Sequence, residues 1–201
     1  MEAERGGMRQ NKENPLLTEE TERRLVDAAI TARKSAYAPY SAYLVGAAVL
    51  CVDGSIYTGG NIENASYGAT VCAERVAILK AVNDGRAPIA ALAVAGSPAQ
   101  GRGSRETTDT ASESETKTGQ PTVQADTADT DALRTEPYAD GEITQAAYPC
   151  GICRQVLREF ADPRACVVLV ADRGGRYRRH TLAELLPESF DPAQLGVEVR
   201  A

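Results

Sequence analysis

The stretch Gly151-Ile-Cys-Arg-Gln-Val-Leu-Arg-Glu-Phe-Ala-Asp-Pro-Arg-Ala-Cys-Val-Val-Leu-Val-Ala171 joins a helical pattern to a strand pattern. Residues 151–161 are expected to be a helix that ends before Asp162-Pro163, because a proline restricts the backbone of the residue before it. Residues 165–171 form a short apolar run, typical of a buried strand. A similar run, Ile89 to Ala95, comes earlier. The order strand, helix, strand predicts parallel pairing with a right-handed crossover.

The segments around this unit predict further elements. They are a helix capped by Thr18, a hairpin of residues 43–50 and 55–58, a buried helix over residues 72–83, an edge strand over residues 176–180, and a short last helix opened by Thr181. Thr18 is a residue that favours the N-cap position, and Asp53-Gly54 is a pair that tight hairpin turns prefer. Thr181 and Glu184 have the spacing of a capping box. The chain is therefore expected to be an α/β protein.

The length of 201 residues favours one domain with a full hydrophobic core. Residues 1–17 are polar without periodicity and are expected to form a flexible tail before a domain at 18–201. Residues 100–145 are rich in Thr, Asp, Glu, Ser, Gly and Gln, with few large aliphatic side chains. Such a segment buries too little surface to offset its ordering entropy. We expect it to be a disordered acidic insertion into the domain.

The charge distribution argues against a nucleic acid as the main partner. The formal net charge is −6, and residues 100–145 alone hold ten acidic and four basic residues, which leaves the rest of the chain near neutral. Phosphate contacts need clustered Lys and Arg. No run of 18 apolar residues is present, and the first seventeen residues lack the apolar centre of a signal peptide. The sequence predicts a soluble cytoplasmic protein without membrane contacts.

Two short segments hold the residues with chemical potential: Cys72-Ala73-Glu74-Arg75 and Pro149-Cys150-Gly151-Ile152-Cys153-Arg154-Gln155. Three cysteines are one fewer than the four ligands of a closed structural zinc site, so they indicate an open zinc position. Cys150 and Cys153 are three residues apart, which places both sulfurs on one face of a first helical turn. The other two cysteines lie in apolar runs and are expected to be buried thiols.

A carboxylate and two arginines accompany these cysteines. Zinc makes the proton of a bound water easier to lose, and Glu74 could accept that proton and deliver it to a substrate nitrogen. Three thiolates overcompensate the charge of Zn²⁺, and Arg75 and Arg154 are placed to offset the excess. Such a site suits hydrolytic attack on an amidine-like carbon with ammonia as the leaving group.

Other interpretations of these residues stay open at this point. Cys150 and Cys153 could be a redox pair or half of a structural zinc knuckle, and Glu74 could be a favourable acid in a first helical turn. A redox pair does not need Cys72, however. A structural zinc site needs a fourth ligand, and the single histidine, His180, lies near a strand end rather than beside a cysteine.

At the level of motifs, the chain resembles the small homotetrameric zinc-dependent cytidine deaminases over about residues 20–200, apart from the insertion. The matching segments are Ala38-Pro39-Tyr40-Ser41, Val45-Gly46-Ala47-Ala48, Asn61-Ile62-Glu63-Asn64, the two cysteine segments, and Glu184-Leu185-Leu186-Pro187. This resemblance implies a three-layer α/β/α domain around a five-stranded mixed sheet. It also implies deamination of cytidine and 2′-deoxycytidine in pyrimidine salvage.

The resemblance also implies a role for individual residues. Cys72, Cys150 and Cys153 match the ligands of one zinc ion per subunit, and Glu74 matches the general acid/base. Asn61 and Glu63 match residues that bind the ribose 3′-hydroxyl. Tyr43 and Ala73 are expected to contact the base, with Tyr43 where the family usually has Phe, and Tyr67 and Phe190 to complete the site of a neighbouring subunit. Arg75 and Gln155 are expected beside the zinc ligands.

Three rival functions are less compatible with the sequence. A deaminase of a blasticidin-type cytosine nucleoside would share the zinc motifs, but Asn61 with Glu63 favours a plain ribose. A polynucleotide-editing deaminase would need a basic surface. A zinc-stabilised binding protein without turnover would need a fourth ligand or a lost glutamate.

The insertion is expected to emerge beside the active-site mouth as a solvated appendage that leaves the chemistry intact.

Overall fold

The computed structural model describes residues 15–99 and 142–196. Its strands are β1 (Tyr43–Cys51), β2 (Ile56–Gly60), β3 (Ile89–Pro98), β4 (Val167–Ala171) and β5 (Tyr177–Thr181). Its helices are α1 (Glu19–Ala32), α2 (Ala73–Asn83), α3 (Gly151–Phe160) and α4 (Leu182–Leu185). Short 3₁₀ turns lie at Arg33–Ser35, Tyr67–Ala69, Arg173–Gly175 and Pro192–Leu195. Each predicted element is present, and β3 extends three residues beyond the predicted strand.

The five strands form one mixed sheet in the order β2-β1-β3-β4-β5. The hairpin strands β1 and β2 pair antiparallel, and β1 also pairs antiparallel with β3. The pair β3 and β4 is parallel, and β5 lies antiparallel at the edge. The parallel pairing and the edge strand that the sequence predicts are therefore confirmed.

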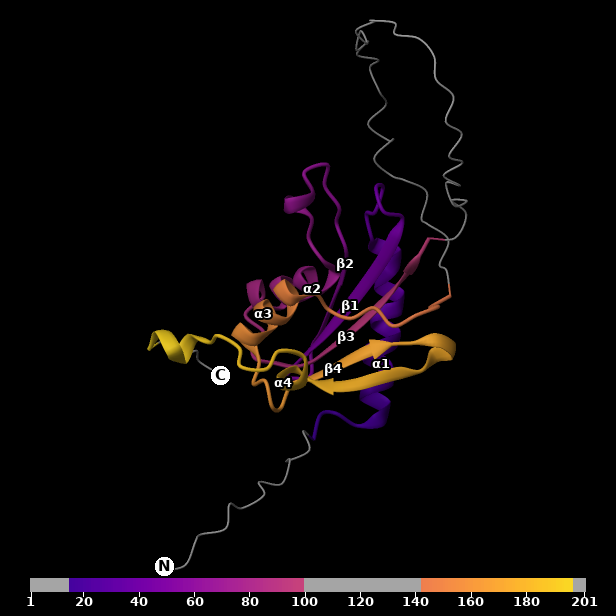
Figure 1. Cartoon of the computed structure of the whole chain (residues 1–201). Helices are drawn as coiled ribbons and strands as arrows, with labels where there is room; N and C mark the ends of the chain where they lie inside the picture. Colours follow the sequence, from indigo (N-terminus) through magenta and orange to yellow (C-terminus); the bar gives the residue numbers. More distant parts are fainter. Residues whose placement is uncertain (1–14, 100–141, 197–201) are drawn as a thin grey trace, which may run out of the picture.

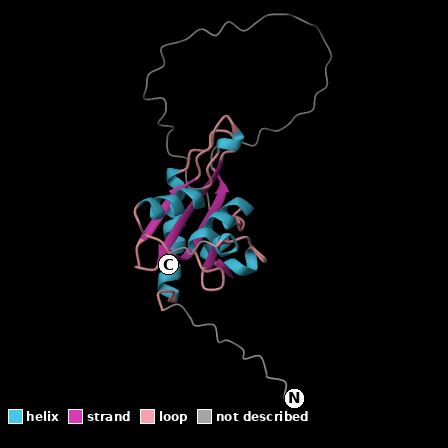
Figure 2. Ribbon diagram, turned by 90° about the vertical axis from the view of Figure 1, so that its left-hand side faces the viewer, coloured by secondary structure: helices cyan, strands magenta, loops and turns pink. Residues whose placement is uncertain are grey.

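Helices cover both faces of this sheet, as Figures 1 and 2 show. On one face α1 buries Leu25, Val26 and Ala29 against small and branched residues of β1, β3 and β4. On the other face α2 and α3 lie side by side and bury Ala77, Ile78 and Leu157. The apolar faces of the helices and the alternation along the strands produce these two cores. The fold is the expected three-layer α/β/α domain.

The local signals at the helix ends behave as the sequence predicts. Thr18 is the N-cap of α1, where its hydroxyl accepts a hydrogen bond of 3.2 Å from the backbone N–H of Thr21. Thr181 and Glu184 form the predicted capping box at α4. A side chain that accepts from the first turn satisfies a backbone donor that the helix leaves unpaired.

The predicted tail and insertion lie mainly outside the described residues, which include only residues 15–17 of the tail and 142–145 of the insertion. Leu16 and Leu17, placed in the tail, pack partly against the core under α1. Ile143, placed in the insertion, is buried in the same core with 7% of its surface exposed. Large aliphatic side chains at the ends of polar segments remain able to join a nearby core. Over the described ranges, no helix is both apolar and long enough to cross a bilayer.

Candidate metal centre

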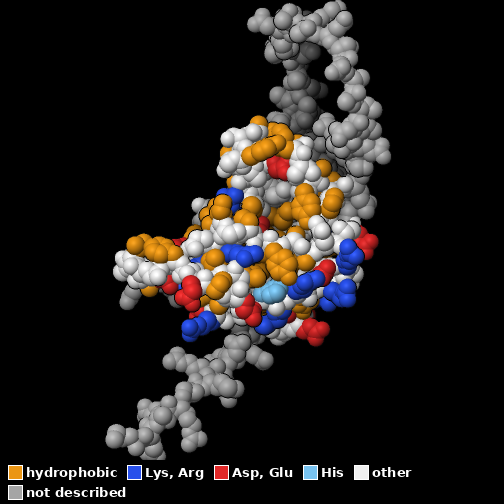
Figure 3. All heavy atoms as spheres, in the orientation of Figure 1, with side chains coloured by type: hydrophobic (Ala, Val, Ile, Leu, Met, Phe, Trp, Pro, Cys, Tyr) orange, Lys and Arg blue, Asp and Glu red, His pale blue; other side chains and the backbone are white. Residues whose placement is uncertain are grey.

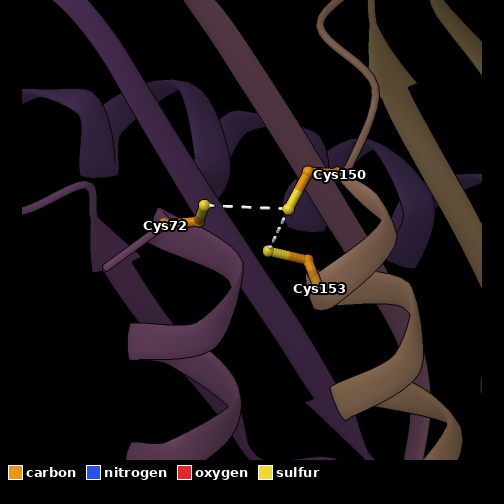
Figure 4. Close-up of side chains that lie close together, drawn as sticks. All are labelled: Cys72, Cys150 and Cys153. Atoms are coloured by element: carbon orange, nitrogen blue, oxygen red, sulfur yellow. Dashed lines mark hydrogen bonds between the residues drawn. The ribbon is translucent and has the colours of Figure 1, made fainter. Parts of the chain in front are cut away.

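Two helices begin at the same place and bring the three predicted cysteines together, as Figure 4 shows. Cys72 is the N-cap of α2 and Cys150 is the N-cap of α3, with Cys153 one turn into α3. The sulfurs of Cys72 and Cys150 are 3.9 Å apart, and those of Cys150 and Cys153 are 3.4 Å apart. Segments far apart in the sequence therefore meet at one sulfur cluster.

The spacing of this cluster fits a tetrahedral zinc site. All three sulfur atoms lie within 4.8 Å of one another. Zinc–sulfur bonds of about 2.3 Å at tetrahedral angles place sulfurs roughly 3.8 Å apart. Among residues 15–99 and 142–196, the group of potential ligands that forms here consists of these three cysteines alone. His180 instead contacts Tyr148, with the hydroxyl oxygen 3.5 Å from Nε2. The set leaves one position of a tetrahedron for a water or a substrate.

The three thiols influence one another electrostatically. The hydrogen bond with Cys153, together with Arg75 and Cys150, lowers the pKa of Cys72 to about 5. The same bond with Cys72 and burial raise the pKa of Cys153. A cluster in which one thiolate forms at the expense of its neighbour needs a cation to hold three thiolates. The donor set therefore favours a metal such as Zn²⁺, which soft sulfur ligands select.

The two arginines near the ligands have different partners. Nη2 of Arg75 lies 3.9 Å from the sulfur of Cys72 and donates a 2.7 Å hydrogen bond to the carbonyl of Thr70. Arg154 donates to the carbonyls of Pro149 and Leu185 at 2.8 and 2.7 Å. Arg75 is thus placed to offset thiolate charge, whereas Arg154 links the start of α3 to the end of α4 through hydrogen bonds.

Glu74 lies in the first turn of α2, two residues after Cys72, and is 4% exposed. Burial raises the pKa of Glu74 to about 7, and the neighbouring Cys72 thiolate contributes to the increase. A carboxyl group with a pKa near neutrality can both accept and donate a proton. Ala73, between the two, is fully buried, and its carbonyl faces Gly59 of β2.

Gly59 is a positioning feature that the sequence analysis missed. A Cβ at this residue would lie 2.7 Å from the carbonyl oxygen of Ala73 and 2.7 Å from Cβ of Val76. The first turn of α2, which holds Glu74, therefore rests directly on the backbone of β2. A glycine inside a strand is a known signal for such a close approach, and it was available in the sequence.

Asn61 and Glu63, predicted to bind ribose, are held by hydrogen bonds within the protein. The Asn61 amide accepts from the backbone N–H of Val45 at 2.9 Å and donates to the carbonyl of Tyr43 at 3.0 Å. Glu63 accepts from the backbone N–H groups of Tyr40 and Ser41 and from the Ser41 hydroxyl. Both side chains are therefore oriented before any ligand arrives, and part of their hydrogen-bonding capacity is already used.

The predicted aromatic residues and Gln155 lie in different settings. Tyr43 is half-buried at the start of β1, with its ring over Gly96 and near Ala147. Tyr67 is 75% exposed and stacks edge-on against Tyr40, and Phe190 is 56% exposed. Gln155 donates a 2.9 Å hydrogen bond to the Phe190 carbonyl and so ties the C-terminal segment to α3.

Comparisons with known proteins agree with this site. The family model described as "Cytidine and deoxycytidylate deaminase zinc-binding region" matches residues 19–170. The cytidine deaminase of Halalkalibacterium halodurans is 36% identical over 166 residues, covering 83% of this chain and 91% of the relative. The cytidine deaminase of Mycobacterium tuberculosis is 32% identical over 172 residues, covering 86% of this chain and 91% of the relative.

Solved structures give the same result. The crystal structure of cytidine deaminase from Burkholderia pseudomallei superimposes with a TM-score of 0.58 at 32% identity, covering 87% of this chain and 100% of that chain. The sulfur cluster, the adjacent buried glutamate and the three-layer fold are thus found together with family-level similarity over most of the chain. The chain belongs to the zinc-dependent cytidine and deoxycytidylate deaminase family.

Proposed function

We propose that the protein hydrolyses cytidine and 2′-deoxycytidine to uridine and 2′-deoxyuridine with release of ammonia, as an enzyme of pyrimidine salvage. The observation that carries this proposal is the buried Glu74 beside three sulfurs that fit one zinc ion. The relatives named above are cytidine deaminases, which supports cytidine as the substrate. A cytoplasmic location agrees with cysteines that are all unpaired.

In this mechanism Cys72, Cys150 and Cys153 would hold a zinc ion, which would supply a Lewis acid that lowers the pKa of water. Glu74 takes the proton from the attacking water and delivers it to the ring nitrogen of the pyrimidine. The oxygen of the water bonds to the carbon that bears the amino group. The carbon–nitrogen bond then breaks as Glu74 passes the remaining proton of the added hydroxyl to the departing nitrogen, so that ammonia leaves and a carbonyl remains. Glu74 acts as base and acid in turn.

Other residues bind and orient the nucleoside. Asn61 and Glu63 hold the ribose 3′-hydroxyl with the donor and acceptor capacity that their internal bonds leave. Tyr43 lies against the base, and backbone atoms of Ala73 contact its edge. Arg75 offsets thiolate charge next to Cys72, and Gln155 holds the segment that carries Phe190.

The test of this activity compares the wild type with Glu74→Gln, which keeps the size of the side chain but cannot carry the proton. We expect ammonia release from cytidine by the wild type, loss of at least about a hundredfold in kcat in the variant, and equal zinc content in both. Equal activity would refute the role of Glu74. A wild type that binds zinc without turnover would instead indicate a binding protein.

We also propose that the protein is a homotetramer whose active sites are completed by neighbouring subunits. The outer side of α2 bears an open hollow of about 630 Å³, lined by Ile62, Val71, Val76, Leu79, Lys80, Val82 and Asn83. Figure 3 shows hydrophobic side chains at the upper end and at the left-hand end of the coloured surface. Tyr67 and Phe190 are exposed rings that a second copy would cover.

The variant Leu79→Glu tests this assembly, because Leu79 lies in the hollow and is 51% exposed. A charge there should leave smaller species in native mass spectrometry and reduce cytidine turnover, since isolated subunits lack the completing residues. Val52→Glu is the matched control, since Val52 is 48% exposed in the hairpin turn and lies outside the hollow. A Leu79→Glu protein of unchanged mass and activity would contradict the interface.

A further inference from the structure

The ring of Tyr43 occupies space that exists because residue 96 has no side chain. A Cβ at Gly96 would lie 2.9 Å from Cε1 of Tyr43 and 3.2 Å from its hydroxyl oxygen. It would also lie 2.7 Å from Cβ of Ala147. Gly96 is not among the residues with positive φ, so its backbone conformation is open to any residue. The glycine is therefore required here for space alone.

This space lies on the sheet face that holds the sulfur cluster. Ala47 and Val49 of β1 and Val94 of β3 pack in the core on the side of α2 and α3. Side chains alternate along a strand with a period of two, so Tyr43 and Gly96 belong to the same face. Ala147 comes three residues before Cys150. The half-buried Tyr43 ring thus lies over Gly96 of β3, near the segment that leads to a zinc ligand.

We propose that Gly96 is a positioning residue for the pyrimidine base, acting through Tyr43. The inference rests on the proposed function, in which Tyr43 lies against the base. A methyl group at residue 96 would meet two neighbours, of which the Tyr43 ring is the end of a side chain that can rotate. The Ala147 Cβ is fixed to a backbone that continues into the Cys150 turn. The ring therefore yields at its own contact by rotation, which displaces it from its place beside the base, whereas the contact with Ala147 is relieved only by a shift of backbone.

The first experiment measures steady-state kinetics and zinc content of Gly96→Ala. A displaced ring weakens the binding of the substrate equally in the ground state and in the transition state. We therefore expect KM for cytidine to rise about tenfold, while kcat stays within about twofold of the wild-type value. Zinc content should stay at one ion per subunit. An unchanged KM, or a parallel loss of kcat and zinc, would overturn the proposal, because the glycine would then be unimportant or merely structural.

A double-mutant cycle with Tyr43→Val isolates the contact with the ring. In the Tyr43→Val background the Gly96→Ala change should alter KM by less than about twofold, because the ring that it displaces is gone. An equal rise in both backgrounds would assign the effect to Ala147 and refute a role through Tyr43. If Gly96→Ala alone fails to fold, Gly96→Ala with Ala147→Gly removes the shorter contact and should still show the raised KM.

Binding of uridine, measured by calorimetry, gives a readout that does not depend on turnover. The dissociation constant of uridine should rise by the same factor as KM in Gly96→Ala and should stay constant across the Tyr43→Val pair. A wild type that binds uridine but releases no ammonia from cytidine would refute the proposed function and leave this test intact. Uridine binding unaffected by Gly96→Ala would refute the positioning role.

Discussion

Arg75 and Arg154 both closely follow a cysteine ligand in the sequence, yet only one of them contacts sulfur. The guanidinium of Arg75 lies 3.9 Å from the sulfur of Cys72. Arg154 is occupied by two backbone carbonyls. Because three thiolates exceed the charge of Zn²⁺ by one, a cation in contact with sulfur preserves the power of the metal to acidify water. Compensation of thiolate charge should therefore depend on Arg75.

We predict different defects for matched variants of these two arginines. Arg75→Gln should lower kcat for cytidine about tenfold, equivalent to about 1.4 kcal/mol of barrier, with zinc retained. Arg154→Gln should keep kcat per zinc-loaded molecule but lower the free energy of unfolding by about 1–3 kcal/mol, since the carbonyls of Pro149 and Leu185 lose a charged donor. Kinetics, zinc analysis and denaturant titration distinguish the catalytic defect from the stability defect. If Arg154→Gln showed the catalytic defect and Arg75→Gln the stability defect, charge compensation would come from Arg154.

Among the elements, the contact between α2 and β2 determines where Glu74 lies. The backbone of Gly59 approaches the carbonyl of Ala73, and a Cβ there would also lie 2.8 Å from the backbone N of Ala77. These neighbours are helix backbone, which cannot rotate away as a side chain can. A change at residue 59 must therefore shift the first turn of α2 as a unit.

We predict that Gly59→Ala lowers both stability and zinc affinity. Overpacking of this kind costs roughly 1–3 kcal/mol, which for a chain of this size corresponds to a fall in Tm of about 2–12 °C. Calorimetry and competition with a zinc chelator measure the two effects. Gly68→Ala is the control, because among the described residues no atom beyond its chain neighbours lies within 4 Å of the added Cβ. A normal Tm and zinc affinity in Gly59→Ala would show that α2 is not held by this contact.

A feature could be predicted from the sequence where it depends on residues close together in the chain, and could not where it depends on contacts between distant segments. Some signals operate within a few residues, such as the capping side chains Thr18 and Thr181 and the spacing of Cys150 and Cys153. The helix starts and the position of these two thiols on one face of α3 were therefore predictable. The burial of Ile143 and the internal hydrogen bonds of Glu63 depend on segments that meet only in the folded chain. The internal bonds of Glu63 show that the motif does not reveal how much hydrogen-bonding capacity this side chain keeps for the proposed ribose contact.

At the scale of the whole molecule, the ends of the proposed insertion can now be placed more precisely. The burial of Ile143 shows that the core resumes by that residue, and Ala99 is still bound through its N–H to the Ala42 carbonyl at 2.7 Å. A replacement of residues 100–145, the bounds expected from the sequence, would remove the core side chain of Ile143. The segment to replace is therefore 100–141.

We predict that a Gly-Ser linker in place of residues 100–141 leaves kcat and KM for cytidine within about threefold of the wild type, because every proposed site residue lies outside that segment. Kinetics and native mass spectrometry check the activity and the assembly. An additional Ile143→Ala change in the shortened chain should lower stability by about 2–5 kcal/mol. Loss of activity with the assembly intact would show that the segment contributes to catalysis.

The sulfur cluster also has a consequence for the connectivity of the chain. A zinc ion bound by Cys72 and Cys150 cross-links residues that are 78 positions apart in the sequence. Such a link restricts the unfolded chain much as a disulfide does, and the entropy of closing a loop grows only with the logarithm of its length. Removing residues 100–141 would roughly halve the loop, which changes the closure term by about 0.6 kcal/mol. A long segment between two zinc ligands is therefore thermodynamically inexpensive, and this family fold can accept one without weakening its metal centre.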